Sequence, residues 1–173
     1  TPQRPINAYG GSKLAIEQML RDFAAISDLT YVIFRYFNVA GADPDAESGE
    51  DHDPETHLVP LVLQAISGAR PALTIHGTDY ATPDGTAIRD YVHVSDLVDA
   101  HVAGLQKLLE GGESGVYCLG TGTGFSVREV VAAARAVTSR EVPMEDGPRR
   151  AGAAVRLVCG SARARGVMGW EPA

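Results

Sequence analysis

The sequence predicts an α/β fold with a parallel sheet, and three observations carry this prediction. Segments with helical and strand-like periodicity alternate along the 173 residues. Residues 30–37 (TYVIFRYF) are β-branched and aromatic with little alternation, which is typical of a parallel strand covered on both faces. Ser126 and Glu129 form a capping box three residues apart, which marks the start of a helix shortly after a strand-like run.

The first half of the chain contains three expected elements. A helix is expected from about Ser12 to Ser27, with an apolar stripe of Ile16, Met19, Leu20 and Phe23. The strand at 30–37 follows it, and helix then strand is half of a βαβ unit whose other half is not in this sequence. After an acidic loop, a helix begins at Leu58 or Pro60 and runs to about Ser67, with Gly68 as its C-cap.

The second half continues the alternation. We expect strands at 73–76, 88–94 and 116–119, short strands near 142 and at 155–158, and a loop at 77–85. One helix is expected from Ser95 or Asp96 to Gly111, and a helical turn from 161 to 170. Another helix begins at Ser126, and its predicted buried side consists of Val127, Val130, Val131, Ala134 and Val137.

Composition excludes several classes of protein. With 45% hydrophobic and 21% charged residues the chain is expected to be globular, and 173 residues suffice for a core. A net charge of −7 argues against a nucleic-acid partner. Cys118 and Cys159 are too few for a disulfide framework, and no apolar run is long enough to span a bilayer. The start of the sequence has no signal-peptide pattern, so we expect a cytoplasmic protein with no membrane partner.

The loop at 43–57 contains seven acidic residues, which raises the question of calcium binding. Counting from Asp43, the sixth position is Ser48 rather than Gly and the twelfth is Pro54 rather than Glu. The loop is therefore not an EF-hand. We expect a solvated loop and no metal site.

The glycines at 120, 122 and 124 lie between a strand and a helix, where a dinucleotide-binding loop could lie. The GxGxxG pattern needs a glycine at 125 or 127, and those positions hold Phe125 and Val127. A tight turn that binds no pyrophosphate is the better interpretation.

Tyr9 and Lys13 lie one helical turn apart and are the candidate catalytic pair. A phenol has a pKa of about 10, and a neighbouring ammonium group favours its ionised form. The spacing alone is also compatible with an ordinary surface pair.

Around this pair the sequence resembles the Tyr-x-x-x-Lys helix of the short-chain dehydrogenase/reductase superfamily. Four further segments are similar to the UDP-glucose (UDP-galactose) 4-epimerase family. They are Arg35-Tyr-Phe-Asn-Val-Ala-Gly41, His57-Leu-Val-Pro60, the stretch from Gly77 to Val94 with its Arg89-Asp-Tyr-x-His93, and Arg149-Arg-x-Gly152.

The resemblance implies an NAD-dependent epimerase acting on UDP-hexoses through a 4-keto sugar. Tyr9 and Lys13 would be catalytic and, with Phe37, would contact the cofactor. The implied substrate-binding residues are Asn38, His57, Leu58, Thr74, Ile75, His76, Arg89 and Arg150. Bidentate hydrogen bonds from Arg89 and Arg150 to a diphosphate would explain how an acidic protein binds a dianion.

The resemblance also implies a domain organisation. Residues 1–42 would be the last elements of a Rossmann-like sheet, and 43–173 a small α/β substrate-binding region, partly interleaved with it. The N-terminal NAD-binding portion is expected to be absent, so the isolated chain should be inactive, whereas the parent protein would be a homodimer.

One residue departs from the family pattern, and three other functions stay open. The family's Arg-x-Gly-Asp is here Gly152-Ala153, which removes a carboxylate and leaves ribose or uridine selectivity in doubt. A 4,6-dehydratase or uronic-acid epimerase would share Tyr9 and Lys13. The chain could also be a non-catalytic nucleotide-sugar-binding module or an interaction fragment.

Overall fold

Parallel strand pairing in the computed structural model, which describes residues 2–173, confirms the α/β prediction. The helices are α1 (Ala8–Ala25), α2 (Leu58–Ser67), α3 (Val94–Leu109), α4 (Val127–Thr138) and α5 (Ala162–Met168). The strands are β1 (Val32–Arg35), β2 (Asn38–Ala40), β3 (Leu73–His76), β4 (Ile88–His93), β5 (Gly115–Cys118), β6 (Gly124–Ser126), β7 (Met144–Gly147) and β8 (Arg156–Leu157).

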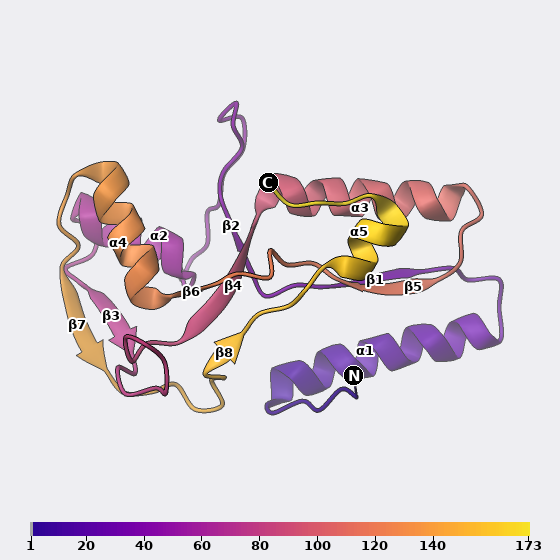
Figure 1. Cartoon of the computed structure of the whole chain (residues 1–173), viewed down its shortest axis with the longest axis horizontal. Coiled ribbons are helices and arrows are strands. Elements are labelled where there is room, and N and C mark those ends of the chain that lie inside the picture. The colour runs from indigo at the N-terminus through magenta and orange to yellow at the C-terminus, as the bar shows by residue number, and fades with distance from the viewer. Residues whose placement is uncertain (1) are drawn as a thin grey trace.

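The strands form three small hydrogen-bonded groups. β1 pairs with β5, β3 pairs with β7, and β4 pairs with β2 and β8, all in parallel, whereas β4 and β6 are antiparallel. In Figure 1, α1 lies on one side of β1 and β5, while α3 and α5 lie on the other. α2 and α4 accompany β3 and β7 at the opposite end of the molecule, and β4 runs between the two ends.

Each end of the molecule has its own hydrophobic core. One cluster joins α2, β3 and α4 through Leu61, Val62, Ala65, Leu73, Ile75, Val131 and Val142. The other joins β4, α3, β5 and α5 through Val92, Leu97, Ala100, Tyr117, Leu119, Ala164 and Trp170. The Trp170 indole also donates to the Asp96 carbonyl oxygen at 2.6 Å, which fixes the last helix against α3.

Two predicted boundaries near the N-terminus are wrong. The first helix begins at Ala8, not Ser12, because the Asn7 side chain accepts a hydrogen bond from the Gly10 amide and caps the helix there. The predicted strand 30–37 is broken, because Arg35 ends the pairing with β5 and Asn38 begins pairing with β4. Asn38 therefore starts a new strand.

Other boundaries differ by a few residues. α3 begins at Val94, where the His93 side chain accepts from the Ser95 amide and replaces the predicted cap at Ser95 or Asp96. β6 was not expected, and the strand predicted near 142 lies at Met144–Gly147, with Val142 in the core. The capping box of Ser126 and Glu129 and the left-handed C-cap at Gly68 are confirmed.

Helical periodicity identified apolar faces, but some of them are not buried. On α1, Ile16, Met19 and Phe23 are 52%, 58% and 60% exposed. On α4, the prediction that Val137 is buried is wrong, since it is 87% exposed. Periodicity shows that a face is apolar, and the surrounding elements decide whether it is covered.

Within residues 2–173, no helix combines the length and the apolar character that crossing a bilayer would require.

Candidate functional site

Tyr9 and Lys13 lie together in the first two turns of α1. The Lys13 Nζ atom is 5.3 Å from the centroid of the Tyr9 ring, a cation–π distance. The Tyr9 side chain is 72% exposed, so its hydroxyl is open to a ligand. The structure therefore brings the predicted pair into contact on an accessible surface.

A partly buried ion pair joins this helix to the sheet. Glu17, which is 7% exposed, accepts from Arg35 Nε at 2.7 Å and from Arg35 Nη2 at 2.5 Å. Arg21 and Gln3 add hydrogen bonds to the same carboxylate. These hydrogen bonds, that of Arg35 first, lower the pKa of Glu17 despite its burial. The pair thereby joins α1 to the end of β1, just before Phe37 and Asn38.

The loop that contains Arg150 contacts the start of the same helix. The Asn7 Nδ2 atom donates to the Gly152 carbonyl oxygen at 3.4 Å, across 145 residues of sequence. Gly152 has φ +71°, a left-handed conformation that favours glycine. Tyr9 and Arg150 therefore lie in two segments that touch each other.

Arg89 is a half-buried cation on β4. It donates to the neighbouring Ile88 carbonyl oxygen at 2.8 Å, and no carboxylate oxygen among residues 2–173 lies within 4.0 Å of it. Burial lowers the pKa of Arg89, an effect that the phenols of Tyr91 and Tyr80 partly oppose. Burial also raises the pKa of Tyr91 to about 12. A buried guanidinium without an anion is unfavourable, so this position favours an anionic ligand.

Arg149 joins the Arg89 region to the Arg150 loop. Its Nε atom donates to Asp79 Oδ1 at 2.7 Å, and its guanidinium carbon lies 4.3 Å from the centroid of the Tyr80 ring. Tyr80 is 6% exposed, and its phenol is one of the two that partly oppose the lowering of the Arg89 pKa. Sequence reasoning missed Asp79 and Tyr80 as structural residues, although both lie in the Gly77–Val94 segment.

The predicted residues of β3 do not share one face. Ile75 is 1% exposed and packs in the core, so only its backbone is available to a ligand. Thr74 donates to Glu145 Oε1 at 2.7 Å, and His76 pairs with Gly147, three residues before Arg150. Of these three residues, the half-buried His76 lies closest to the loop that contains Arg150, because its strand partner Gly147 is three residues before Arg150.

Asn38 lies on β2 beside β4, whereas His57 and Leu58 lie at the start of α2. Asn38 pairs with Tyr91, two residues after Arg89, and the neighbouring Phe37 is 41% exposed. Leu58 begins α2 and packs on its core cluster, and His57 is the N-cap residue of that helix. Two open cavities of about 420 and 560 Å³ lie here, both lined by Gly41, Glu50 and His52. Neither cavity is lined by Tyr9, Arg89 or Arg150.

Asp90 explains why the glycine-rich turn is not a phosphate loop. Its carboxylate, 1% exposed, accepts hydrogen bonds from the amides of Thr121, Gly122 and Cys159 and from the Thr121 hydroxyl. The amides that could bind a phosphate therefore already bind a carboxylate. A Cβ on Gly120 would lie 2.7 Å from Asp90 Oδ2, so this turn also requires glycine. The segment turns from β5 into β6, which begins at Gly124, rather than directly into the helix as predicted.

Comparison with known proteins places these features in context. Residues 1–120 match the sequence model of the NAD dependent epimerase/dehydratase family. The chain is 50% identical to a UDP-glucose 4-epimerase of Lacticaseibacillus casei over 99% of its own length and 52% of the relative's. It is 53% identical to the UDP-glucose 4-epimerase of Azospirillum brasilense, over 99% of its own length and 49% of the relative's. The chain thus spans about half the length of these relatives.

Solved structures of UDP-glucose 4-epimerases contain the same fold as this chain. The chain superposes on the Brucella ovis UDP-glucose 4-epimerase in complex with NAD with a TM-score of 0.93 and 47% identity, covering 99% of this chain and 53% of that one. The structure of the Bifidobacterium longum UDP-glucose 4-epimerase in complex with NAD⁺ and UDP superposes with a TM-score of 0.93 and 37% identity. The superposition covers 100% of this chain and 52% of that one.

Proposed function

The chain belongs to the NAD dependent epimerase/dehydratase family, and we propose that it supplies the Tyr–Lys pair and the nucleotide-sugar contacts of a UDP-glucose 4-epimerase. The observation that carries this proposal is the joining of the Tyr9 helix to the Arg150 loop by Asn7 and Gly152. The proposal is also supported by the exposed Tyr9 phenol beside the Lys13 ammonium group, and by Arg89, a half-buried guanidinium whose only side-chain hydrogen bond within residues 2–173 goes to a backbone carbonyl oxygen.

In this proposal Tyr9 moves the proton of the sugar. As phenolate it removes the proton from the C4 hydroxyl while hydride leaves C4, and it returns the proton to the 4-keto sugar after the hexose has turned over. Lys13 stabilises the phenolate and binds the nicotinamide ribose. Bound NAD would supply the acceptor, and then the donor, of the hydride at C4 of the sugar, so that the hydride could return to the other face of the sugar ring.

Residues of this chain fit one end of the cofactor. Lys13 contacts the Tyr9 ring, and Phe37 leaves 41% of its surface open to pack on a nicotinamide. Within residues 2–173 the glycine-rich turn at 120–124 is occupied by Asp90, so the pyrophosphate would bind elsewhere in the parent protein.

Substrate contacts would grip the diphosphate and leave the hexose free to rotate. Arg89 and Arg150 would bind the two phosphates, Asn38 would donate to a phosphate oxygen, and the His57–Leu58 pair would hold the same diphosphate. The strand Thr74–His76 would face the uracil, with His76 stacking and Ile75 contributing only its backbone.

Three finer points belong to the same proposal. The exposed apolar face of α1 supports a homodimer of the parent protein through this helix. The pairing of β1 with β5 supports a Rossmann-like part, about 1–42, interleaved with a substrate-binding part, about 43–173. Both cysteines are free, as is usual in a reducing compartment, which supports a cytoplasmic location.

The test joins this chain to the portion of the Lacticaseibacillus casei relative that it does not span. The fusion is incubated with NAD and UDP-galactose, and the products are identified by chromatography. We expect UDP-glucose from the fusion and none from the chain alone. Formation of only a keto-deoxy sugar would contradict the assignment and indicate a 4,6-dehydratase.

A further inference from the structure

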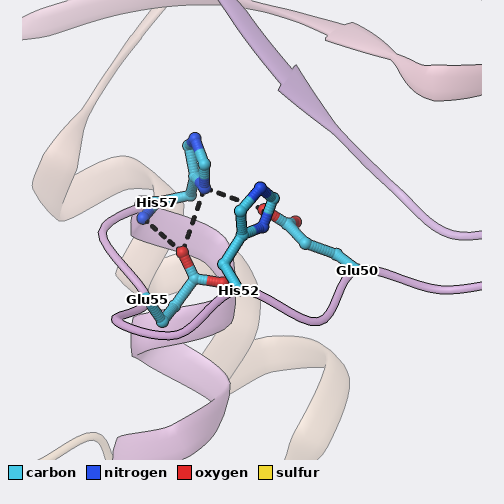
Figure 2. A group of neighbouring side chains, drawn as sticks. All are labelled: Glu50, His52, Glu55 and His57. Atoms are coloured by element: carbon cyan, nitrogen blue, oxygen red, sulfur yellow. Dashed lines mark hydrogen bonds and ion pairs between the residues drawn. The ribbon is translucent and has the colours of Figure 1, made fainter.

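Four potential metal ligands converge in the loop between β2 and α2. They are Glu50, His52, Glu55 and His57, and their ligand atoms all lie within 4.8 Å of one another. Figure 2 shows the four side chains gathered together, with dashed lines joining the His57 ring to the carboxylates of Glu50 and Glu55. The function proposed above does not use Glu50, His52 or Glu55. It does use His57, whose Nδ1 atom faces the two carboxylates and leaves Nε2 for a phosphate.

The contacts within this group are short. His57 Nδ1 lies 2.8 Å from Glu50 Oε1 and 3.0 Å from Glu55 Oε1, and His52 Nδ1 lies 3.0 Å from Glu50 Oε1. The Nδ1 atom of His57 carries at most one proton, which cannot serve both carboxylates well. One ion held between the four groups would satisfy all of them at once.

The donor set selects the kind of ion. Zn²⁺ takes four imidazole or carboxylate ligands at about 2.0–2.2 Å, which places neighbouring ligand atoms roughly 3.3 Å apart in a tetrahedron. Three of the separations are 2.8–3.0 Å and all lie within 4.8 Å, so side-chain rotations would bring the four ligand atoms to that spacing. Ca²⁺ and Mg²⁺ prefer six or more oxygen ligands, so the two imidazoles disfavour them.

The charge of the loop also favours a cation. Residues 43–57 contain seven acidic residues and no Lys or Arg. Two carboxylates and two neutral imidazoles carry a charge of −2, which a divalent ion neutralises. The candidate site therefore offsets part of the repulsion within this loop.

Parts of the group are held in place before any ion binds. The Glu55 side chain is 7% exposed, and its Oε1 atom accepts from the amides of Thr56 and His57 at 2.6 and 2.7 Å. His57 is the N-cap of α2, whose Leu61, Val62 and Ala65 are buried in the core. Hydrogen bonds to a ligating carboxylate of this kind orient it for the metal.

We propose that Glu50, His52, Glu55 and His57 bind one divalent transition-metal ion of the Zn²⁺ type, which fastens the acidic loop to the start of α2. The loop then forms a fixed wall of the cavities lined by Gly41, Glu50 and His52. This differs from the sequence-based expectation of a solvated loop without a metal.

Calorimetric titration of the metal-free chain with Zn²⁺ tests the proposal. We expect one ion per chain, with binding at least tenfold weaker in His52→Ala and in Glu55→Gln, because even outer-shell partners are worth tenfold or more. Asp51→Asn, an exposed acid of the same loop, is the matched control and should bind Zn²⁺ like the original chain. A Zn²⁺-dependent rise in Tm that His52→Ala abolishes would give independent support.

Three outcomes would overturn the site. They are the absence of Zn²⁺ binding, Zn²⁺ binding that His52→Ala leaves unchanged, and binding lost only in the Cys118→Ser/Cys159→Ser variant. Equal competition by Ca²⁺ would overturn the choice of ion. Arg89→Lys should not change Zn²⁺ binding, which keeps this test separate from that of the nucleotide site.

Discussion

The Asn7 side chain serves two segments at once: its Oδ1 atom caps α1 through the Gly10 amide at 2.8 Å, and its Nδ2 atom donates to Gly152 at 3.4 Å. The helix start that contains Tyr9 and the loop that contains Arg150 are therefore held by one residue. Its two roles can be separated by substitution.

Asn7→Ala should destabilise the fold by about 1 kcal/mol, because it removes the helix cap. Asn7→Asp keeps an acceptor for the cap and loses only the exposed donor to Gly152, so its free energy of unfolding should stay within about 0.5 kcal/mol of the original. Urea unfolding measures the free energy of unfolding of both variants. Equal losses in the two variants would show that the cap does not hold this helix end.

Tyr9→Phe should leave stability nearly unchanged and remove catalysis. The phenol is 72% exposed, so the free energy of unfolding should change by less than about 0.5 kcal/mol. In the fusion with the Lacticaseibacillus casei portion, epimerisation should fall by about 10²–10⁴-fold, the usual contribution of a positioned acid–base group. Retention of activity in this folded variant would remove Tyr9 from the mechanism.

Glu17→Gln should destabilise the chain by about 2 kcal/mol at neutral pH, because it leaves the Arg35 guanidinium half-buried without its anion. Glu47→Gln, an exposed change of the same kind, is the control. Chemical denaturation compares the two.

The same pair predicts a pH dependence. The pKa of Glu17 is lowered on folding, so its stabilisation is fully present above the ordinary value of 4.5 and is lost as pH falls through the lower folded pKa. The difference in stability between the original chain and Glu17→Gln should therefore shrink in acid below about pH 4.5. A constant difference down to acid pH would contradict the ion-pair account.

Asp90→Asn should destabilise the fold by about 2–4 kcal/mol. The amides of Gly122 and Cys159 both donate to Asp90 Oδ2, and an amide NH₂ group at that position would face two donors with no acceptor. Asp99→Asn, at an exposed position of α3, is the matched control and should be neutral. Thermal unfolding that does not distinguish the two variants would count against this role of Asp90.

Local patterns in the sequence predicted the α/β class, most helices and the contact between Tyr9 and Lys13, because these depend on residues a few positions apart. The capping box at Ser126 and the αL glycine at 68 are of the same kind. The break between β1 and β2 was not predictable, since it results from a change of partner strand.

The contacts that assemble the candidate site join distant residues. Arg35 and Glu17 are 18 residues apart, Asp90 and Cys159 are 69 apart, and Asn7 and Gly152 are 145 apart. A single sequence carries no information on such pairings. The resemblance to a family identified the arginines, whereas the structure identified the residues that hold their loops.

Calorimetry of UDP binding to this chain tests the central claim most directly, since the claim is that Arg89 and the Arg150 loop form a site for a nucleotide diphosphate. We predict one UDP per chain, with affinity reduced about tenfold or more in Arg89→Lys, because a point charge replaces a bidentate donor. Uridine, which has no phosphate, should bind weakly, and with equal affinity to the original chain and to the Arg89→Lys variant. Absence of UDP binding, or UDP binding that Arg89→Lys leaves unchanged, would contradict the account.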